Sequence, residues 1–201
     1  GIDSPIVFGQ SFGGMVAMHY AARYPKSVSK LILSSTAAQF RLDETKKMMC
    51  KLGGDYAAEV AYQFFSKPSQ AAYDTYGKVC LPLYSNPNAP AAGNFRNRAI
   101  ERPEVALHFF SYEMARMDMR SEIASITCPT LVIGGTIDPV TPPICSQVIA
   151  DAIGKNACLK LFEACGHGPH RDNPDGAEHV MRSFLSICLL YTSPSPRDSN
   201  L

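Results

Sequence analysis

Gly9-Gln10-Ser11-Phe12-Gly13-Gly14 is the stretch from which the fold of this 201-residue sequence can be inferred. An apolar run, residues 6–8, leads into it, and a helical stretch rich in small residues, residues 15–24, leads out of it. The change from a strand pattern to a helix pattern within a few residues predicts that Ser11 lies on a tight turn between the two elements.

A serine on such a turn fits a nucleophile elbow. Passing from a strand directly into a helix forces the serine into a strained backbone conformation, and we expect side chains at positions 9 and 13 to collide with the turn. The backbone N–H of Phe12, at the positive end of the helix, would then point to where an acyl oxyanion forms. The same residues also fit a glycine-rich turn with a surface serine, so the motif alone does not decide.

Composition narrows the class of protein. Apolar residues make up 46% of the chain and the formal net charge is +1, which is typical of a globular protein with neither nucleic acid nor membrane as a partner. The seven cysteines show no Cys-x-x-Cys spacing, so we expect reduced, buried thiols and a cytoplasmic protein. No metal or other cofactor is expected, and the sequence leaves the oligomeric state open.

The two ends of the chain carry separate expectations. The sequence opens without Met, inside what reads as a central strand, so we expect an N-terminal truncation. Residues 188–198 resemble the in-frame translation of a sequencing-library adapter, and we interpret residues 188–201 as a non-native or disordered tail. A natural Ser/Pro-rich tail is the alternative.

The order of the predicted elements indicates an α/β fold with a parallel sheet. Apolar strands are expected at residues 4–8, 30–34, 129–135 and 158–163, and helices follow the last two at residues 143–153 and 174–187. Residues 38–126 differ, because they read as amphipathic helices at 42–52, 55–65, 69–80 and 103–117. We therefore expect a core of residues 1–37 and 127–187, with residues 38–126 as an all-helical insertion.

Three loops at the carboxyl ends of these strands carry Ser11, Asp138 and His167. His167 would accept the Ser11 proton during attack on a carbonyl and pass it to the leaving group, while Asp138 would orient the imidazole and stabilise its charge. Asp138, which precedes a proline, also fits a turn residue or a helix cap, and His167 also fits a simple loop histidine.

The other histidines are weaker candidates. His170 is the rival base, but it lies further from the strand end, and we expect His19 and His179 to have packing or surface roles. A metal site formed by the cysteine, histidine and aspartate side chains of residues 165–172 has suitable ligand types but no standard spacing.

These residues resemble the α/β-hydrolases, and more loosely the proline iminopeptidase-like serine hydrolases. The matching stretches are the Ser11 turn, the strand at 129–135 with the following Asp138-Pro139, and Gly166-His167-Gly168 with residues 171–174. The resemblance covers residues 4–187 and implies that the helical insertion is a cap over the active site. It also implies a small-molecule or short-peptide substrate.

In proline iminopeptidases, acidic cap residues bind the free amino group of the substrate, and Glu113, among aromatic residues, is the candidate here. A solvent-facing helix acid is the alternative interpretation. Release of N-terminal proline from peptides is thus the sharpest functional hypothesis, a carboxylesterase or other small-molecule hydrolase is the alternative, and a non-catalytic binding protein of the same fold comes third.

The family's second oxyanion donor comes from a loop after an earlier strand that is not found in this sequence. Loss of one such donor costs about 100- to 1,000-fold in rate. The strand before Ser11 would also become an exposed sheet edge, which favours aggregation. We therefore expect the 201-residue chain by itself to be insoluble or inactive.

Overall fold

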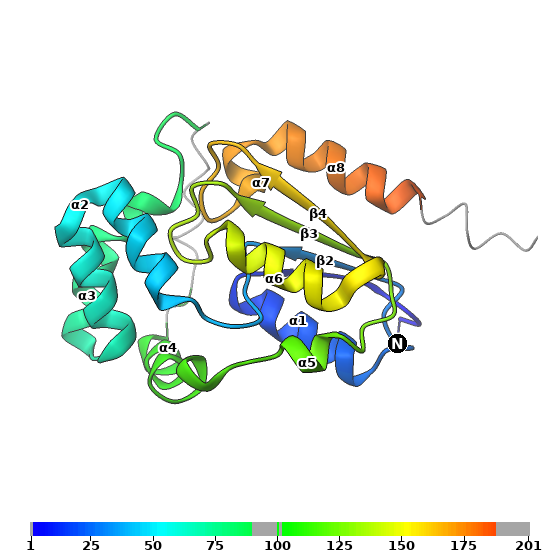
Figure 1. The fold of residues 1–201 in the computed structure, drawn as a ribbon, viewed down its shortest axis with the longest axis horizontal. Helices are drawn as coiled ribbons and strands as arrows, with labels where there is room; N and C mark the ends of the chain where they lie inside the picture. The colour runs from blue at the N-terminus through cyan, green and yellow to red at the C-terminus, as the bar shows by residue number, and fades with distance from the viewer. Residues whose placement is uncertain (1, 90–99, 101, 188–201) are drawn as a thin grey trace, which may run out of the picture.

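The computed structural model describes residues 2–89, 100 and 102–187, so the expected tail at 188–201 and part of the loop expected at 85–93 lie outside the described residues. Its centre is a parallel sheet in the order β1-β2-β3-β4 (Figure 1). The strands are β1 (Ile6–Gln10), β2 (Lys30–Ser34), β3 (Thr130–Gly135) and β4 (Ala157–Phe162). The predicted α/β fold with a parallel sheet is confirmed.

Helices cover both faces of the sheet. On one face, α1 (Phe12–Arg23), α5 (Arg120–Ile123) and α6 (Pro143–Ile153) pack on the side chains of Leu31, Leu33 and Val132. On the other face, α8 (Pro174–Ile187) packs on the alternate side chains, Ile32, Leu131 and Ile133. Because both faces are covered, β2 and β3 are buried along their whole length, and their central residues are apolar without alternation.

The strand before Ser11 is an edge strand. Within the described residues, β1 pairs only with β2, in a parallel register that sets Gly9 beside Leu33. Ile6 and Phe8 on this strand are 51% and 48% exposed. The expectation of an exposed sheet edge at this strand is therefore confirmed.

The helical insertion forms a layer beyond the carboxyl ends of the strands, on the left in Figure 1. Its aromatic-rich core includes Met49, Phe64 and Tyr76. By contrast, Met119, Ile123 and Ile126, near its C-terminal end, pack in the same cluster as α1 and α6. Besides α5, the described elements of the insertion are α2 (Leu42–Ser66), α3 (Gln70–Val79), the 3-10 helix η1 (Leu81–Tyr84), α4 (Pro103–His108), the π-helix η3 (Phe109–Glu113) and the 3-10 helix η4 (Met114–Arg116).

Two details differ from the sequence-based expectations. The helix expected over 103–117 is divided into α4, a π-helical turn and a 3-10 turn. Hydrophobic periodicity does not reveal such a wide turn, because the apolar residues continue through it. Cys50 and Cys158 are exposed rather than buried, and Cys158 is exposed because its strand, β4, is the other edge of the sheet.

The remaining described elements are α7 (Pro169–Asp172), in the loop after β4, and the 3-10 helix η5 (Gly154–Asn156). α2 consists of two helices joined across a kink at Gly54, where the backbone is non-helical (φ 75°, ψ −176°), so the helix pair expected on either side of Gly53-Gly54 is confirmed. Within the described residues, no helix combines the length and apolar character needed to cross a membrane.

Candidate active site

Ser11 lies between the end of β1 and the start of α1, in a backbone conformation that L-residues rarely adopt (φ 51°, ψ −123°). The surrounding structure holds it there. Its N–H donates to the carbonyl of Ser34 at 3.0 Å, and its own carbonyl accepts from the Thr36 hydroxyl at 2.7 Å. The predicted strained turn at Ser11 is therefore present.

The glycines around Ser11 differ in how closely neighbouring atoms approach them. A Cβ on Gly9 would lie 2.5 Å from the Gly13 carbonyl oxygen, and a Cβ on Gly14 would lie 2.6 Å from the Thr36 side chain. A Cβ on Gly13 would meet nothing within 4 Å. The expected collision at position 13 is therefore wrong, because Gly13 faces solvent, and the close approach at Gly14 was not anticipated.

Gly9→Ala should destabilise the protein by about 1–3 kcal/mol, since the added methyl group must displace backbone atoms of the turn. Gly13→Ala is the matched control, because the same methyl group enters open space in the same turn. Urea unfolding of the two variants checks this. Equal midpoints for both variants would contradict the assignment of Gly9 as the crowded position.

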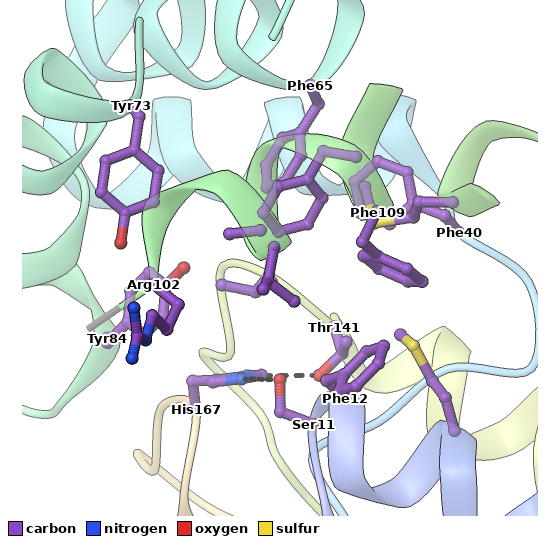
Figure 2. A pocket seen from close by; sticks show the side chains of 16 residues that line it. Ser11, Phe12, Phe40, Phe65, Tyr73, Tyr84, Arg102, Phe109, Thr141 and His167 are labelled. Carbon is purple, nitrogen blue, oxygen red and sulfur yellow. Dashed lines mark hydrogen bonds between the residues drawn. The ribbon is translucent and has the colours of Figure 1, made fainter. Parts of the chain in front are cut away.

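The structure brings together the three residues predicted from separate loops. His167 Nε2 lies 2.9 Å from Ser11 Oγ, a hydrogen bond that is drawn in Figure 2. His167 Nδ1 lies 3.0 Å from Asp138 Oδ1 and 2.9 Å from Oδ2. Asp138 is fully buried and His167 is 5% exposed, so little water competes for these hydrogen bonds.

The surroundings of Asp138 favour the ionised carboxylate. Backbone N–H groups of Val140 and Thr141 donate to Oδ1, and the Thr141 hydroxyl donates to Oδ2, each at 2.9 Å. Burial by itself raises the pKa of Asp138, but the nearby His167 and these hydrogen bonds bring the pKa below its usual value. An ionised carboxylate only accepts hydrogen bonds, so His167 carries its proton on Nδ1 and offers Nε2 to Ser11.

The two alternatives for Asp138 can now be separated. Its bonds to the N–H groups two and three residues ahead are those of a turn residue, so it has that role as well. It does not cap α6, because the residue at the N-cap of that helix is Pro142.

The backbone of His167 is held by groups that sequence reasoning missed. Its N–H donates to the carbonyl of Tyr84 at 2.7 Å, and its carbonyl accepts from the Gln10 side chain at 3.2 Å. The Arg171 guanidinium donates to the same carbonyl. Tyr84 lies more than eighty positions away in the sequence, and no local pattern could reveal the contact.

A second link joins the insertion to the histidine loop. Asp172 Oδ2 accepts from the N–H of Gly166 at 2.7 Å and from the N–H of Asn86 at 2.9 Å. A Cβ on Gly166 would lie 2.3 Å from the Tyr84 carbonyl oxygen, so glycine permits the close approach. Asp172 therefore links the histidine loop to the insertion through hydrogen bonds, rather than serving as a ligand in the metal site considered above. Within the described residues, no group of three or more His, Cys, Asp or Glu is placed to hold a metal ion.

A cavity of about 520 Å³ lies between Ser11 and the helical insertion (Figure 2). Aromatic and aliphatic side chains dominate its lining, and the insertion supplies most of them. The described lining residues are Ser11, Phe12, Met15, Phe40, Phe65, Tyr73, Tyr84, Arg102, Val105, Ala106, Phe109, Phe110, Met114, Val140, Thr141 and His167.

Glu113 is not among these lining residues. It lies at the end of η3, is exposed, and borders a separate groove together with Val16 and His19. The structure therefore does not bring it to Ser11.

Within the described residues, the hydrogen bonds that join Asp138 to Ser11 involve His167 and not His170, His19 or His179. His170 is half-buried, and within the described residues its Nδ1 has no partner; burial and the nearby Arg171 lower its pKa. His19 pairs with Glu122 at 2.7 Å, and His179 is exposed on α8.

Comparison with known proteins places the chain in a family. The model of the family described as serine aminopeptidase, S33, matches residues 3–174. The chain belongs to this family. It is an α/β-hydrolase of the serine hydrolase type.

Two similar proteins are named for different activities. The chain is 30% identical over 187 residues to the proline iminopeptidase PfmaB of Pestalotiopsis fici, with 90% of this chain and 66% of that protein covered. It is 26% identical to a pimeloyl-[acyl-carrier protein] methyl ester esterase of Neisseria meningitidis, with 92% and 70% covered. The chain thus spans about two thirds of the length of these relatives.

Solved structures support the fold. An esterase from Exiguobacterium antarcticum superposes with a TM-score of 0.64 at 20% identity, covering 92% of this chain and 68% of that one. An alpha/beta fold family hydrolase from Bacillus anthracis superposes with a TM-score of 0.61 at 18% identity, covering 88% and 66%. At these identities the likeness concerns the fold alone.

Proposed function

We propose that the protein hydrolyses carboxylic esters of apolar acyl groups through an acyl-enzyme on Ser11. The observation that carries this proposal is the continuous hydrogen-bond chain from buried Asp138 through His167 to a serine held at φ 51°. A surface serine on an ordinary turn would need neither the strain nor the buried partners.

In the first half of the reaction, Ser11 Oγ attacks the substrate carbonyl carbon while His167 Nε2 accepts the hydroxyl proton. The imidazolium then gives this proton to the leaving oxygen as the acyl–oxygen bond breaks. In the second half, water attacks the acyl-enzyme, His167 accepts a proton from the water, and Ser11 leaves protonated. Asp138 stays ionised throughout and stabilises the charge on His167.

The Phe12 N–H is the proposed oxyanion donor. Phe12 is the first residue of α1, so its N–H has no acceptor within the helix and lies at the positive end of the helix dipole. One donor leaves the oxyanion partly stabilised. We therefore propose that the 201-residue chain by itself is much less active than a protein with a second donor.

The lining of the cavity favours an ester over a peptide with a free amino group. Its walls, such as Phe65 and Phe110, suit an apolar acyl chain or ring. Within the described residues no carboxylate lines the cavity, so an ammonium group would enter without a counter-ion.

Release of N-terminal proline is the second candidate, favoured by the similarity to a proline iminopeptidase. Glu113 would then have to turn toward the cavity.

Fluorophosphonate labelling tests the proposed function. The protein is labelled and digested with trypsin, and the adduct is located by mass spectrometry. We expect the adduct on Ser11. A folded protein that takes up no label would support the non-catalytic binding protein instead.

Glu113→Ala should leave hydrolysis of a hexanoate ester unchanged within about twofold, because exposed surface changes away from a site have small effects. The same variant is assayed on proline anilide, with Glu122→Ala as a control for loss of a surface acid. A selective loss of at least tenfold on proline anilide would favour the second candidate.

A further inference from the structure

The cavity over Ser11 has two chemically different ends. In Figure 2, Arg102, Tyr84 and Tyr73 lie on the side of His167, whereas Phe12, Phe109 and Phe40 lie on the opposite side of Ser11. One end is therefore lined by a guanidinium and two tyrosine side chains, and the other by apolar rings.

Arg102 is the only lining residue within the described part of the chain that carries a permanent charge. The carboxylate of Asp138, which contacts His167 Nδ1, does not line the cavity; it is fully buried and already accepts several hydrogen bonds. Within the described residues, the ion-pair partner of Arg102 is Glu104, 3.9 Å away, and both side chains are about two thirds exposed (69% and 67%). Such an exposed ion pair contributes little stabilising free energy, so an anion in the cavity can compete with Glu104 for the guanidinium.

The mechanism decides which part of a substrate reaches Arg102. His167 gives its proton to the leaving oxygen, so the leaving group must lie on the side of His167. The acyl group then extends to the apolar side, toward Phe12 and Phe109. Arg102, on the side of His167, faces the leaving group.

We propose that Arg102 binds an anionic group on the alcohol part of the substrate, so that the preferred substrates are esters of apolar acids with alcohols that carry a carboxylate or phosphate. A guanidinium suits either anion because its N–H donors form a planar fork. This inference rests on the proposed ester hydrolysis. In it, the acyl–oxygen bond breaks, the Ser11 Oγ–acyl bond forms, and the Ser11 proton reaches the leaving oxygen through His167.

The test uses three hexanoate esters that differ only in the para group of the phenol: a carboxylate, a neutral carboxamide and a trimethylammonium. The unaltered protein is compared with Arg102→Met, which keeps a long side chain without the charge, and with Arg102→Glu. We expect Arg102→Met to lower kcat/KM on the carboxylate ester about three- to fivefold, the upper end of what an ion pair with a largely exposed side chain contributes. The carboxamide ester should change less than twofold, and Arg102→Glu should favour the trimethylammonium ester.

The carboxamide ester also reports whether each variant is folded and active. Equal losses on all three esters, or no loss on the carboxylate ester, would overturn the assignment to Arg102 while leaving ester hydrolysis intact. Failure of the unaltered protein to hydrolyse any ester, together with no label on Ser11, would overturn both the proposed function and this inference.

Discussion

Ser11→Ala lowers kcat on an ester substrate by about 10⁴- to 10⁶-fold, the range expected when a serine hydrolase loses its nucleophile. The reason is chemical, because Ser11 Oγ is the atom that His167 Nε2 contacts at 2.9 Å and alanine offers nothing to acylate. Fluorophosphonate labelling should disappear with the activity. Steady-state kinetics and labelling of the purified variant check both.

The chain offers a matched control in Ser35. This serine also has positive φ (45°) and is buried, and its Oγ has no hydrogen-bond partner within the described residues. Ser35→Ala should keep activity within a few fold of the unaltered protein. If Ser11→Ala retained a tenth of the activity and still took up label, the nucleophile would be another residue.

Asp138→Asn lowers kcat by about 10⁴-fold, the effect known for this change in a serine protease triad. The asparagine side chain keeps an oxygen that accepts hydrogen bonds from the N–H groups of Val140 and Thr141. Its NH₂ group, turned to His167, donates to Nδ1 and so favours the imidazole tautomer that carries its proton on Nε2. His167 then no longer accepts from Ser11. KM should change little because Asp138 does not line the cavity.

Asp151→Asn, an isosteric change on the exposed surface of α6, is the control for Asp138→Asn. Equal kinetics for Asp138→Asn and the control would remove Asp138 from the mechanism.

The same carboxylate makes stability depend on pH. The pKa of Asp138 in the folded protein lies below its usual value, so the ionised group contributes stability that is present above the unfolded-state pKa of about 3.9. This contribution is lost as the pH falls through the folded-state pKa. In urea unfolding experiments, the difference in free energy of unfolding between the unaltered protein and Asp138→Asn should therefore become smaller as the pH is lowered.

Local features were predictable from sequence. The bounds of β2, α6 and α8 agree with the expected ranges, because continuous apolar strands and proline-started helices leave clear local patterns. The turn at Ser11 was predictable for the same reason, since glycines flank it between a strand and a helix. Asp138 and His167 could be named because parallel strands deliver their C-terminal loops to one edge.

Contacts within the helical insertion were less predictable. The π-helical turn at Phe109–Glu113 interrupts an apolar pattern that predicts one helix, and Glu113 lies outside the cavity as a result of where this turn packs. Helical periodicity gives the face of a residue but not the neighbour that this face meets.

The sequence by itself determined the parallel α/β core, the strained turn and the three residues that meet there, because each depends on local pattern and strand order. Only the tertiary structure decided that Gly14 rather than Gly13 is crowded, that the Tyr84 carbonyl holds the His167 backbone, and that Arg102 lines the cavity. These features depend on how the insertion packs over the sheet. Such packing brings together segments that are distant in the chain, and no local pattern records it.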